Sequence, residues 1–445
     1  MEYKKTAEIF MTYGQGGWDQ RVHQTVLFGL GETENKVINL YPEVTYQVFD
    51  GFGGAITEAA GYVYSLMDEG QKRQLMEAYF APNRMNYQFI RIPIDSCDFS
   101  LGQYEASAKS DFSDFSFARV EKYILPMLDD AEQAAGRKLQ IILSPWSPPA
   151  YMKTNGRRGF GGKLKEEWWA TWAEYLCRYI YEYRKRGYRV VGLTLQNEAK
   201  AVQTWDSCIF TAAEQKAFLR EHMYPALIRS GLADLEIYIW DHNKERVYEW
   251  MRDIIDEETD KMVAGAAVHW YSGDHFDALA LCKEKFPSKK LIVSESCIEH
   301  YKFDASDVAG TALKLAHEVV GDLNHGISAF IDWNILLDEK GGPNYVQNYC
   351  AAPFFYDTQC KKLHSHLISK YYEHFSSTIV PGSVRIAISQ YSETIDITAW
   401  LRPDASIAVV ILNRASEIKS ICLRLEDKEA EFVMYPESIA TAIIR

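Results

Sequence analysis

The chain has 445 residues, of which 47% are hydrophobic and 24% charged, so it is long enough to bury a large core and to form one large domain with a smaller second one. Its 48 basic and 61 acidic residues give a net charge of −13, which repels phosphate backbones and argues against nucleic acid as a partner. The eight cysteines form no CxxC pair and no zinc-binding spacing, so most are expected to be buried free thiols.

The N-terminal segment, MEYKKTAEIFMTYG, lacks the continuous apolar stretch of a signal peptide. No segment approaches the roughly 20 apolar residues that a membrane-spanning helix needs. The sequence therefore predicts a cytoplasmic protein without integral membrane association. It says little about the oligomeric state.

The first 45 residues contain three strand-like runs, TAEIFMTY, QTVLFGL and KVINLY. Three short strands cannot bury an apolar face by themselves. We therefore expect residues 1–45 to pair with strands elsewhere in the chain.

Eight apolar, β-branched runs follow and alternate with amphipathic stretches. They lie at residues 46–57, 87–95, 138–146, 189–198, 235–243, 262–271, 289–296 and 326–334. The clearest helical stripe recurs at spacings of three and four residues, through Trp169, Trp172, Leu176, Tyr179 and Tyr183. Each strand with its helix therefore forms one βα unit.

Eight βα units over residues 46–374 predict a closed (β/α)8 TIM barrel, the catalytic domain of an α/β protein. A doubly wound open sheet is the structural alternative. It is disfavoured because no GxGxxG or phosphate-binding loop opens the first unit, and GFGG at 51–54 is too compact for a dinucleotide fingerprint.

Residues 375–445 read as short alternating strands. The runs are SVRIAIS, TIDITAWL, SIAVVILN, SICLRLE, AEFVMYP and SIATAIIR. This pattern is typical of a β-sandwich. We expect the strands of residues 1–45 to join it, so that the second domain is built from both chain termini.

Polar and aromatic side chains follow the predicted barrel strands, where the loops of such a barrel form the active face. They are Asp95, Asp98, Trp146, Asn197, Glu198, Asp241, His242, His269, Trp270, Tyr271, Glu295, Asp332, Trp333 and Asn334. Carboxylates can transfer protons or attack, amides bind hydroxyls, and tryptophan faces cover a sugar ring. The set predicts carbohydrate chemistry at one mouth of the barrel.

Metal chemistry is the competing use of some of these residues, because Glu198, His242, His269 and Glu295 could be assembled into a zinc or manganese site. No HxH or HExxH pair fixes two ligands on one element, so we predict no metal. No GxSxG-like elbow supplies a serine nucleophile either.

The sequence resembles glycoside hydrolase family 30, and within it the acid β-glucosidase (glucosylceramidase) group. The resemblance lies in FDGFGGAITEAA (49–60), IRIPIDSCDFS (90–100), LSPWSPPAYMKTNG (143–156), TLQNEA (194–199), VHWY (268–271), VSESC (293–297) and DWNILLDEKGGPN (332–344). These motifs span most of the predicted barrel and occur in the family's order. Ala199 departs from the family's usual proline.

The resemblance implies a role for each matching residue. Glu198 corresponds to the general acid/base and Glu295 to the nucleophile. The residues implied to bind the sugar are Asp98, Trp146, Asn197, Tyr271, Trp333 and Asn348. Arg91 and His269 are implied to support the two carboxylates.

The resulting hypothesis is a retaining β-glycosidase that acts on β-glucosides or oligosaccharides and needs no cofactor. An ionised neighbour and partial burial are expected to raise the pKa of the donor, Glu198. Sibling activities, namely β-1,6-glucanase, β-xylosidase or β-fucosidase, remain open, as does a catalytically silent sugar-binding protein. The presence of both Glu198 and Glu295 argues against the silent protein.

Overall fold

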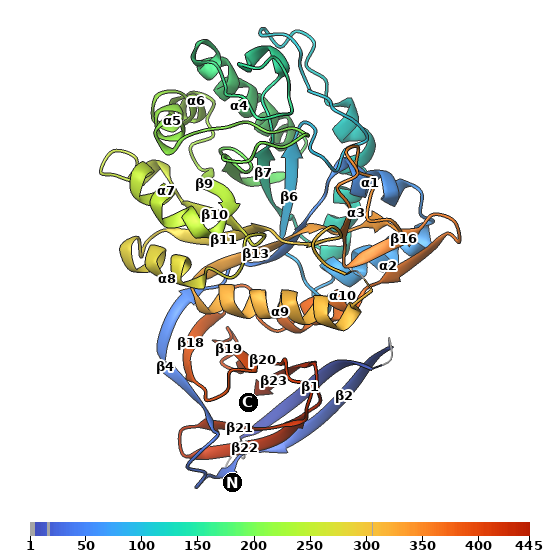
Figure 1. Cartoon of the computed structure of the whole chain (residues 1–445), viewed down its shortest axis with the longest axis vertical. Coiled ribbons are helices and arrows are strands. Elements are labelled where there is room, and N and C mark those ends of the chain that lie inside the picture. The colour runs from blue at the N-terminus through green and yellow to red at the C-terminus, as the bar shows by residue number, and fades with distance from the viewer. Residues whose placement is uncertain (1–4, 16–17, 305) are drawn as a thin grey trace.

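The computed structural model describes residues 5–15, 18–304 and 306–445. A large α/β part lies above a smaller all-β part, and both ends of the chain lie in the all-β part (Figure 1). The α/β part is a closed barrel, and the all-β part is a sandwich whose strands come from both termini. The predicted fold class is therefore confirmed.

The barrel contains eight parallel strands that close on themselves in the order β10-β11-β13-β5-β6-β7-β8-β9. Their bounds are β5 Gly51–Ala55, β6 Phe89–Ile94, β7 Gln140–Pro145, β8 Arg189–Thr194, β9 Glu236–Asn243, β10 Gly265–His269, β11 Lys290–Glu295 and β13 Ile327–Asn334. Each strand overlaps one of the eight predicted runs, in the predicted order. The open-sheet alternative is excluded because β13 pairs with β5.

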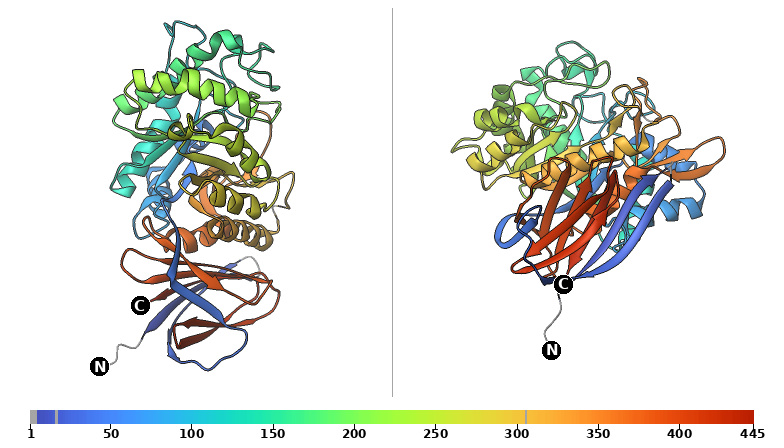
Figure 2. Two further views of the ribbon diagram at one scale, coloured as in Figure 1. Left: turned by 90° about the vertical axis from the view of Figure 1, so that its left-hand side faces the viewer. Right: turned by 60° about the horizontal axis from the view of Figure 1, so that its bottom comes forward.

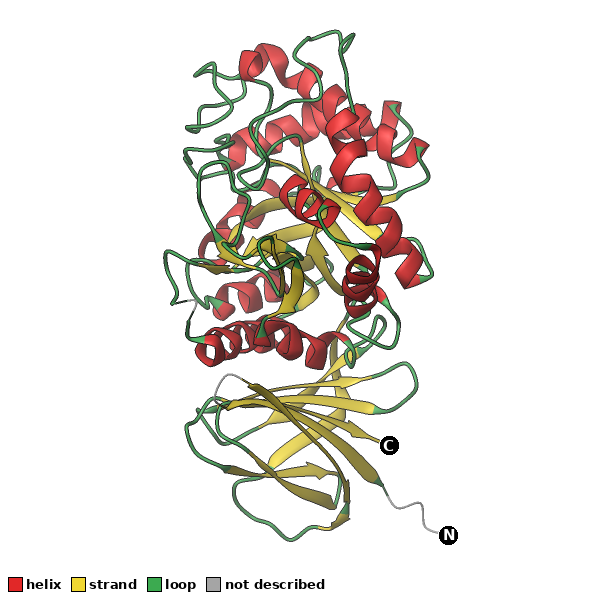
Figure 3. Ribbon diagram, turned by 90° about the vertical axis from the view of Figure 1, so that its right-hand side faces the viewer, coloured by secondary structure: helices red, strands yellow, loops and turns green. Residues whose placement is uncertain are grey.

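Helices cover the outside of the barrel (Figure 3). They are α1 Glu58–Ser65, α2 Glu69–Phe80, α3 Leu125–Ala135, α4 Trp169–Lys185, α5 Ala212–Phe218, α6 Tyr224–Arg229, α7 Val247–Ile254, α8 Phe276–Lys285, α9 Val308–Asn324 and α10 Leu367–Ser376. The aromatic stripe predicted from Trp169 to Tyr183 lies on α4, and all of its members are buried. The 3.6-residue period therefore identified the face of α4 that packs on the barrel.

The run predicted as one strand at 46–57 is divided between the two domains. Residues 46–48 end β4 (Ile38–Val48) of the sandwich, whereas β5 begins the barrel at Gly51. Phe49 between them is fully buried, with its ring 5.5 Å from that of Trp400. Gly51 has φ +143°, which L-residues rarely adopt, so glycine permits the turn from one sheet into the other.

The sandwich is a ten-stranded sheet with the order β2-β1-β23-β20-β19-β18-β4-β21-β22-β3. Its remaining strands are β1 Thr6–Gln15, β2 Trp18–Leu27, β3 Gly29–Leu30, β18 Val384–Ser389, β19 Ile395–Leu401, β20 Ile407–Asn413, β21 Lys419–Leu425, β22 Lys428–Met434 and β23 Ser438–Ile444. Strand β1 pairs antiparallel with β23, so the two ends of the chain are neighbours in one sheet (Figure 2). Alternate side chains of both terminal segments share one apolar core.

The barrel and the sandwich meet where α9 and α10 pack against the sheet. The imidazole of His374 on α10 is buried and bridges the two terminal strands, with Nε2 2.9 Å from the Thr12 hydroxyl and Nδ1 2.8 Å from the Thr441 hydroxyl. Asn324 on α9 donates to the carbonyl of Ile397 at 2.8 Å. Direct hydrogen bonds therefore fix the two domains against each other.

Short strands complete the loops above the barrel. Strands β12 (Ile298–Glu299) and β15 (Cys350–Ala351) form one pair, and β14 (Leu337–Asp338), β16 (Phe354–Asp357) and β17 (Lys362–Ser365) form a three-stranded sheet. All eight cysteines are free, and only Cys360 is exposed, which confirms the expectation of buried thiols. Among the described helices, none has the length and apolar character to cross a bilayer.

Candidate active site

A cavity of about 410 Å³ opens at the carboxyl ends of the barrel strands. Its walls include every residue that we predicted to be catalytic or to bind the sugar: Asp98, Trp146, Asn197, Glu198, Tyr271, Glu295, Trp333 and Asn348. The outer wall adds Gln203, Trp205, Glu299, Tyr301 and Lys302. The fold therefore gathers the predicted site residues around a single space.

Arg91 lies at the floor of this site, on β6, and has no exposed surface. Its guanidinium donates to Glu295 Oε2 at 2.5 Å, to Asn197 Oδ1 at 2.8 Å and to Asp241 Oδ2 at 2.9 Å. Burial alone would lower the pKa of Arg91, but the charges of Asp241 and Glu295 outweigh it and raise the pKa. One planar cation thus orients side chains from β9, from β11 and from the loop that follows β8.

Glu295, at the end of β11, is held by both carboxylate oxygens. Oε2 accepts from Arg91, and Oε1 accepts from the Tyr271 hydroxyl at 2.9 Å. Both contacts are hydrogen bonds from donors that are themselves held within the site. The arrangement fixes the direction in which Glu295 faces the cavity.

Glu198 follows β8 and has an unusual backbone conformation. Its φ is +48°, and Trp240 and Asp241 on the neighbouring β9 have φ of +73° and +54°. The Glu198 N–H donates to the carbonyl of Asp241 at 2.8 Å, which ties the two strained segments together. Such conformations cost about 1–3 kcal/mol each and concentrate at functional sites.

Two imidazoles face the carboxylate of Glu198. Nδ1 of His242 and Nδ1 of His269 each lie 3.4 Å from Glu198 Oε1. Burial alone would raise the pKa of Glu198, but His242 and His269 outweigh it and hold the pKa well below its usual range. The expectation of a raised pKa is therefore wrong for this structure, because the sequence did not show that two imidazoles meet this carboxylate.

His269 is fully buried, and its Nε2 donates to Asp241 Oδ1 at 3.1 Å. Burial alone would lower the pKa of His269, but the negative charges of Glu295, Asp241 and Glu198 raise it to about 9. The imidazole is therefore protonated at neutral pH. Glu198 and His269 form a pair that holds one proton beside the cavity.

Asp98 lies on the opposite wall, 5% exposed. Its Oδ2 accepts from Asn344 Nδ2 at 3.0 Å and from Asn348 Nδ2 at 3.2 Å. Burial and the nearby charge of Glu295 raise the pKa of Asp98 to about 7, although the two amides oppose the rise. The carboxyl is fixed in direction and can bind hydroxyl groups.

Trp146 and Trp333 form the apolar wall, with ring centroids 5.4 Å apart and planes inclined by 25°. The guanidinium of Arg91 lies 4.8 Å from the Trp146 centroid and 5.4 Å from the Trp333 centroid. The wall is therefore rigid and supported from below by a cation.

Six of the predicted strand-end residues do not line the cavity. Asp241 and His269 contact Arg91 and Glu198 behind its wall, and Trp270 Nε1 donates to the carbonyl of Cys297 at 3.0 Å.

The other three are held elsewhere in the fold. Asp95 accepts from the Tyr175 hydroxyl at 2.8 Å, Asp332 accepts from the Tyr372 hydroxyl at 3.1 Å, and Asn334 accepts from the Thr57 hydroxyl at 2.5 Å. Each is buried against a helix or the loop leading into one. Each of these three side chains accepts a hydrogen bond from a hydroxyl group and none of them lines the cavity, although Asn334 Nδ2 is buried without a partner among the described residues.

The sequence analysis assigned no role to three residues that support the site. Asp241 links Arg91 to His269, Ser144 accepts from Arg91 Nε at 3.0 Å, and Asn344 donates to Asp98. The sequence could have indicated Asp241, because this residue lies near the end of a predicted barrel strand. For Asn344, the sequence offered no indication other than its place in the DWNILLDEKGGPN motif.

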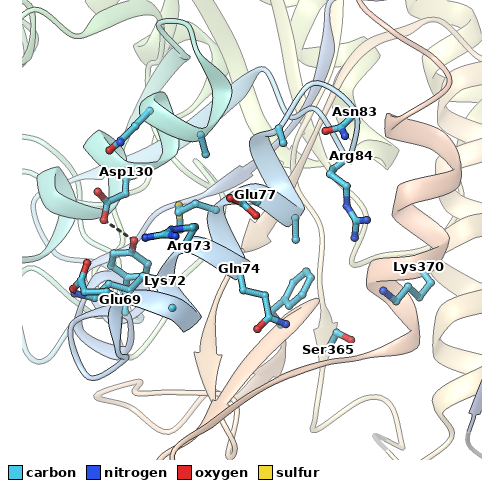
Figure 4. Close-up of a pocket in the computed structure, with 18 residues that line it drawn as sticks. Glu69, Lys72, Arg73, Gln74, Glu77, Asn83, Arg84, Asp130, Ser365 and Lys370 are labelled. Carbon is cyan, nitrogen blue, oxygen red and sulfur yellow. Dashed lines mark hydrogen bonds and ion pairs between the residues drawn. The ribbon is translucent and has the colours of Figure 1, made fainter.

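A larger cavity of about 1120 Å³ lies elsewhere, beside α2 and next to β16 and α10. Figure 4 shows side chains of both charges around it, among them Glu69, Lys72, Arg84 and Asp130. Lys72 pairs with Glu69 at 2.8 Å, and the Tyr64 hydroxyl donates to Asp130 at 2.6 Å. This space lies along the outer helices, away from the carboxyl ends of the barrel strands, so its size does not make it the reaction site.

Comparison with known proteins places the chain among the glycoside hydrolases. It belongs to family 30: the Glycosyl hydrolase family 30 TIM-barrel domain matches residues 49–379, and the Glycosyl hydrolase family 30 beta sandwich domain matches residues 382–442. The resemblance found in the sequence is therefore confirmed.

The curated relatives of this chain are named for different enzymatic activities. The chain is 31% identical over 417 residues to the mouse protein named lysosomal acid glucosylceramidase, covering 89% of this chain and 80% of that one. It is 24% identical over 402 residues to endo-1,6-beta-D-glucanase neg1 of Aspergillus fumigatus, covering 82% of this chain and 78% of that one.

Two solved structures are similar over nearly the whole chain. The crystal structure of SrfJ from Salmonella typhimurium superposes with a TM-score of 0.94 at 35% identity, covering 98% of this chain and 99% of that one. The endo-beta1,6-glucanase BT3312 superposes with a TM-score of 0.88 at 25% identity, with the same coverage.

Proposed function

We propose that this protein is a retaining β-glycosidase that hydrolyses β-glucosides of the glucosylceramidase type. The observation that carries the proposal is the contrast between two carboxylates on one cavity. Glu295 is held by Arg91 and Tyr271, whereas the carboxylate of Glu198 faces two imidazoles, and the raised pKa of one of them, His269, lets it carry a proton. One carboxylate is thus prepared to attack and the other to exchange a proton.

The contacts of Glu295 and Glu198 lead to the following mechanism. Glu295 attacks the anomeric carbon while Glu198, protonated by His269, donates that proton to the leaving oxygen. The product of this step is a glycosyl-enzyme. His269 beside Glu198 carries the proton in the unliganded site, and a bound sugar that excludes water favours its transfer to the carboxylate. Glu198 then takes a proton from water, which attacks the intermediate and restores Glu295.

The sugar is proposed to lie between Asp98 and the Trp146–Trp333 wall. Asp98 binds hydroxyl groups at one side, and Asn197, held by Arg91, is proposed to bind the 2-hydroxyl. Tyr271 and Asn348 complete this part of the cavity. The aglycone then leaves past Gln203, Trp205 and Tyr301.

Glucosides are favoured because the mouse relative is named a glucosylceramidase and aligns over most of both chains. An endo-β-1,6-glucanase is the second candidate, supported by the similarity to BT3312 over nearly the whole chain. The substrates of these two enzymes differ in the group attached to the bound glucose, which is a lipid in one and another glucose in the other.

The test is release of nitrophenol from a panel of nitrophenyl β-glycosides, followed by hydrolysis of a glucosyl lipid and of a β-1,6-glucan. We expect β-glucoside cleavage and a preference for the lipid, and Glu295→Gln as control should abolish both. A preference for the glucan would favour the second candidate. Sugar binding without release from any glycoside would show a silent binding protein.

A further inference from the structure

The carboxylate of Glu198 is part of a cluster of possible metal ligands. Glu198 follows β8, His242 lies on β9 and His269 ends β10. Their ligand atoms all lie within 4.8 Å of one another. Three strands that are adjacent in the barrel therefore bring together one carboxylate oxygen and two imidazole nitrogens.

Both imidazole Nδ1 atoms of the cluster are buried and make no hydrogen bond of acceptable geometry within the described chain. His269 has no exposed surface, and its Nε2 is bound to Asp241 Oδ1 at 3.1 Å. A carboxylate on the far nitrogen of a histidine is the outer-shell arrangement found around metal-bound imidazoles, because it fixes the ring and its tautomer. It directs Nδ1 of His269 towards Glu198.

Two of the three distances between the ligand atoms match those around a tetrahedral ion, and the third is within 4.8 Å. Two ligands at about 2.0–2.1 Å from a tetrahedral Zn²⁺ lie about 3.4 Å apart. Each Nδ1 lies 3.4 Å from Glu198 Oε1. Two histidines, one glutamate and an open fourth position towards the cavity make up a donor set that zinc accepts in proteins.

The surrounding charge also favours a cation. Glu198, Asp241 and Glu295 lie together, and Arg91 pairs with the last two. Among the described residues, the two imidazoles are the groups that pair with Glu198. A divalent ion between them and Glu198 would take the place of the proton on His269 and would compensate that carboxylate.

We propose that Glu198, His242 and His269 form a binding site for a divalent ion of the zinc class, and that its occupation inhibits the enzyme. The inhibition rests on the proposed role of Glu198 in proton transfer. The metal uses the lone pairs of Oε1 and of both Nδ1 atoms and releases to solvent any proton they carried. Glu198 can then neither donate a proton to the leaving group nor accept one from water.

The test measures binding and inhibition separately on the full chain after removal of metals with EDTA. Zinc binding is followed by calorimetry, and Co²⁺ is used as a probe because a tetrahedral site gives it a strong visible absorption. We expect one site that His242→Ala and Glu198→Gln each weaken at least tenfold. Zn²⁺ at the same concentration should lower kcat/KM for a nitrophenyl β-glucoside at least tenfold, and EDTA should restore it.

The matched control is a second group of possible ligands, Asp357, Cys360 and His364, near the β16–β17 turn. The double variant Cys360→Ser/His364→Gln removes that group and should leave both the Co²⁺ absorption and the inhibition unchanged. Loss of both in the double variant, or binding that His242→Ala does not weaken, would overturn the proposal. So would binding at the cluster that leaves kcat/KM unchanged.

These readouts keep the metal site and the proposed function distinguishable. A chain that cleaves no glycoside yet gives a His242-dependent Co²⁺ absorption supports the site and contradicts the glycosidase. A chain that cleaves β-glucosides but gives no such absorption contradicts the site alone.

Discussion

Arg91 and Glu295 form a hydrogen-bonded ion pair of 2.5 Å in which the arginine has no exposed surface. Because Arg91 also binds Asp241 and Asn197, the position of Glu295 depends on a network that spans four strands of the barrel. A buried charge that loses one of its partners is strongly destabilising. The function and the stability of the site are therefore linked through this one guanidinium.

Arg91→Lys tests that link. Lysine keeps the charge but cannot reproduce the planar fork, so at least one charge-assisted hydrogen bond, about 1.5–3 kcal/mol, is lost. We expect kcat/KM to fall at least tenfold and the free energy of unfolding to fall by about 3 kcal/mol. Urea denaturation and steady-state kinetics measure the two effects.

The control is Arg184→Lys, because Arg184 pairs with Asp234 at 2.8 Å on the surface. Exposed pairs contribute at most about 1 kcal/mol, so both quantities should remain close to those of the parent chain. Equal losses in the two variants would show that the Arg91 network has no special role.

The roles of the two glutamates can be assigned by azide rescue. In Glu198→Ala, a dinitrophenyl β-glucoside still forms the glycosyl-enzyme, and azide should attack it to give the β-glucosyl azide. In Glu295→Ala no intermediate forms, and azide in the emptied space should give the α-glucosyl azide. Proton NMR coupling constants distinguish the anomers. Exchanged anomers would reverse the roles, and no rescue in either variant would contradict a retaining mechanism.

Asp98→Ala tests the sugar site. The carboxyl is buried and aimed by Asn344 and Asn348, so its loss should remove hydrogen bonds to the sugar and lower kcat/KM for glucosides at least tenfold. Asp95→Asn is the control, because Asp95 is equally buried but faces Tyr175 outside the cavity. It should lower the melting temperature without a comparable loss of kcat/KM. An active Asp98→Ala enzyme would mean that the sugar lies elsewhere.

Protonation of His374, which joins α10 to the two terminal strands of the sandwich, should destabilise the protein in acid. Burial and the charge of Arg21 lower the pKa of His374 to about 3, below the 6.5 of the free side chain. The unfolded chain then binds the proton more strongly, so stability is complete above pH 6.5 and is lost as pH falls towards 3. Between pH 7 and pH 5 this loss is about 2 kcal/mol.

His374→Gln removes the titration and should flatten the dependence of the urea midpoint between pH 5 and pH 7. It should also lower stability at pH 7, because one amide replaces a ring that bridges Thr12 and Thr441. His364→Gln, on an exposed part of β17, serves as the control and should keep the slope of the parent chain. A parental slope in His374→Gln would remove His374 as the cause.

Removal of residues 1–40 tests the contribution of the N-terminal strands. Strand β1 lies between β2 and β23 in the sheet, so its loss leaves one edge of β23 unpaired and exposes the apolar core beneath β1. The truncated chain should be insoluble or much less stable. Melting at the temperature of the full chain would contradict this.

Local patterns in the sequence were enough to find the eight barrel strands, their order, the buried stripe of α4 and the terminal strands of the sandwich. In a strand or a helix the buried residues recur with the period of that element, which is about 2 or 3.6 residues. The pattern of apolar residues along the chain therefore shows which side chains are buried. Glu198 and Glu295 could be placed on one face for the same reason, because the ends of parallel barrel strands meet at one mouth.

The tertiary structure alone decided which groups touch. The sequence pattern joined residues 46–57 into one strand, because residues of two different sheets have the same β-periodicity. The prediction that no metal binds depended on the lack of two ligands on one element, and the sequence could not show that the fold brings Glu198, His242 and His269 together from three strands. Their contacts depend on barrel closure and on left-handed backbone conformations at Glu198 and Asp241. Neither feature can be predicted from the periodicity of the sequence.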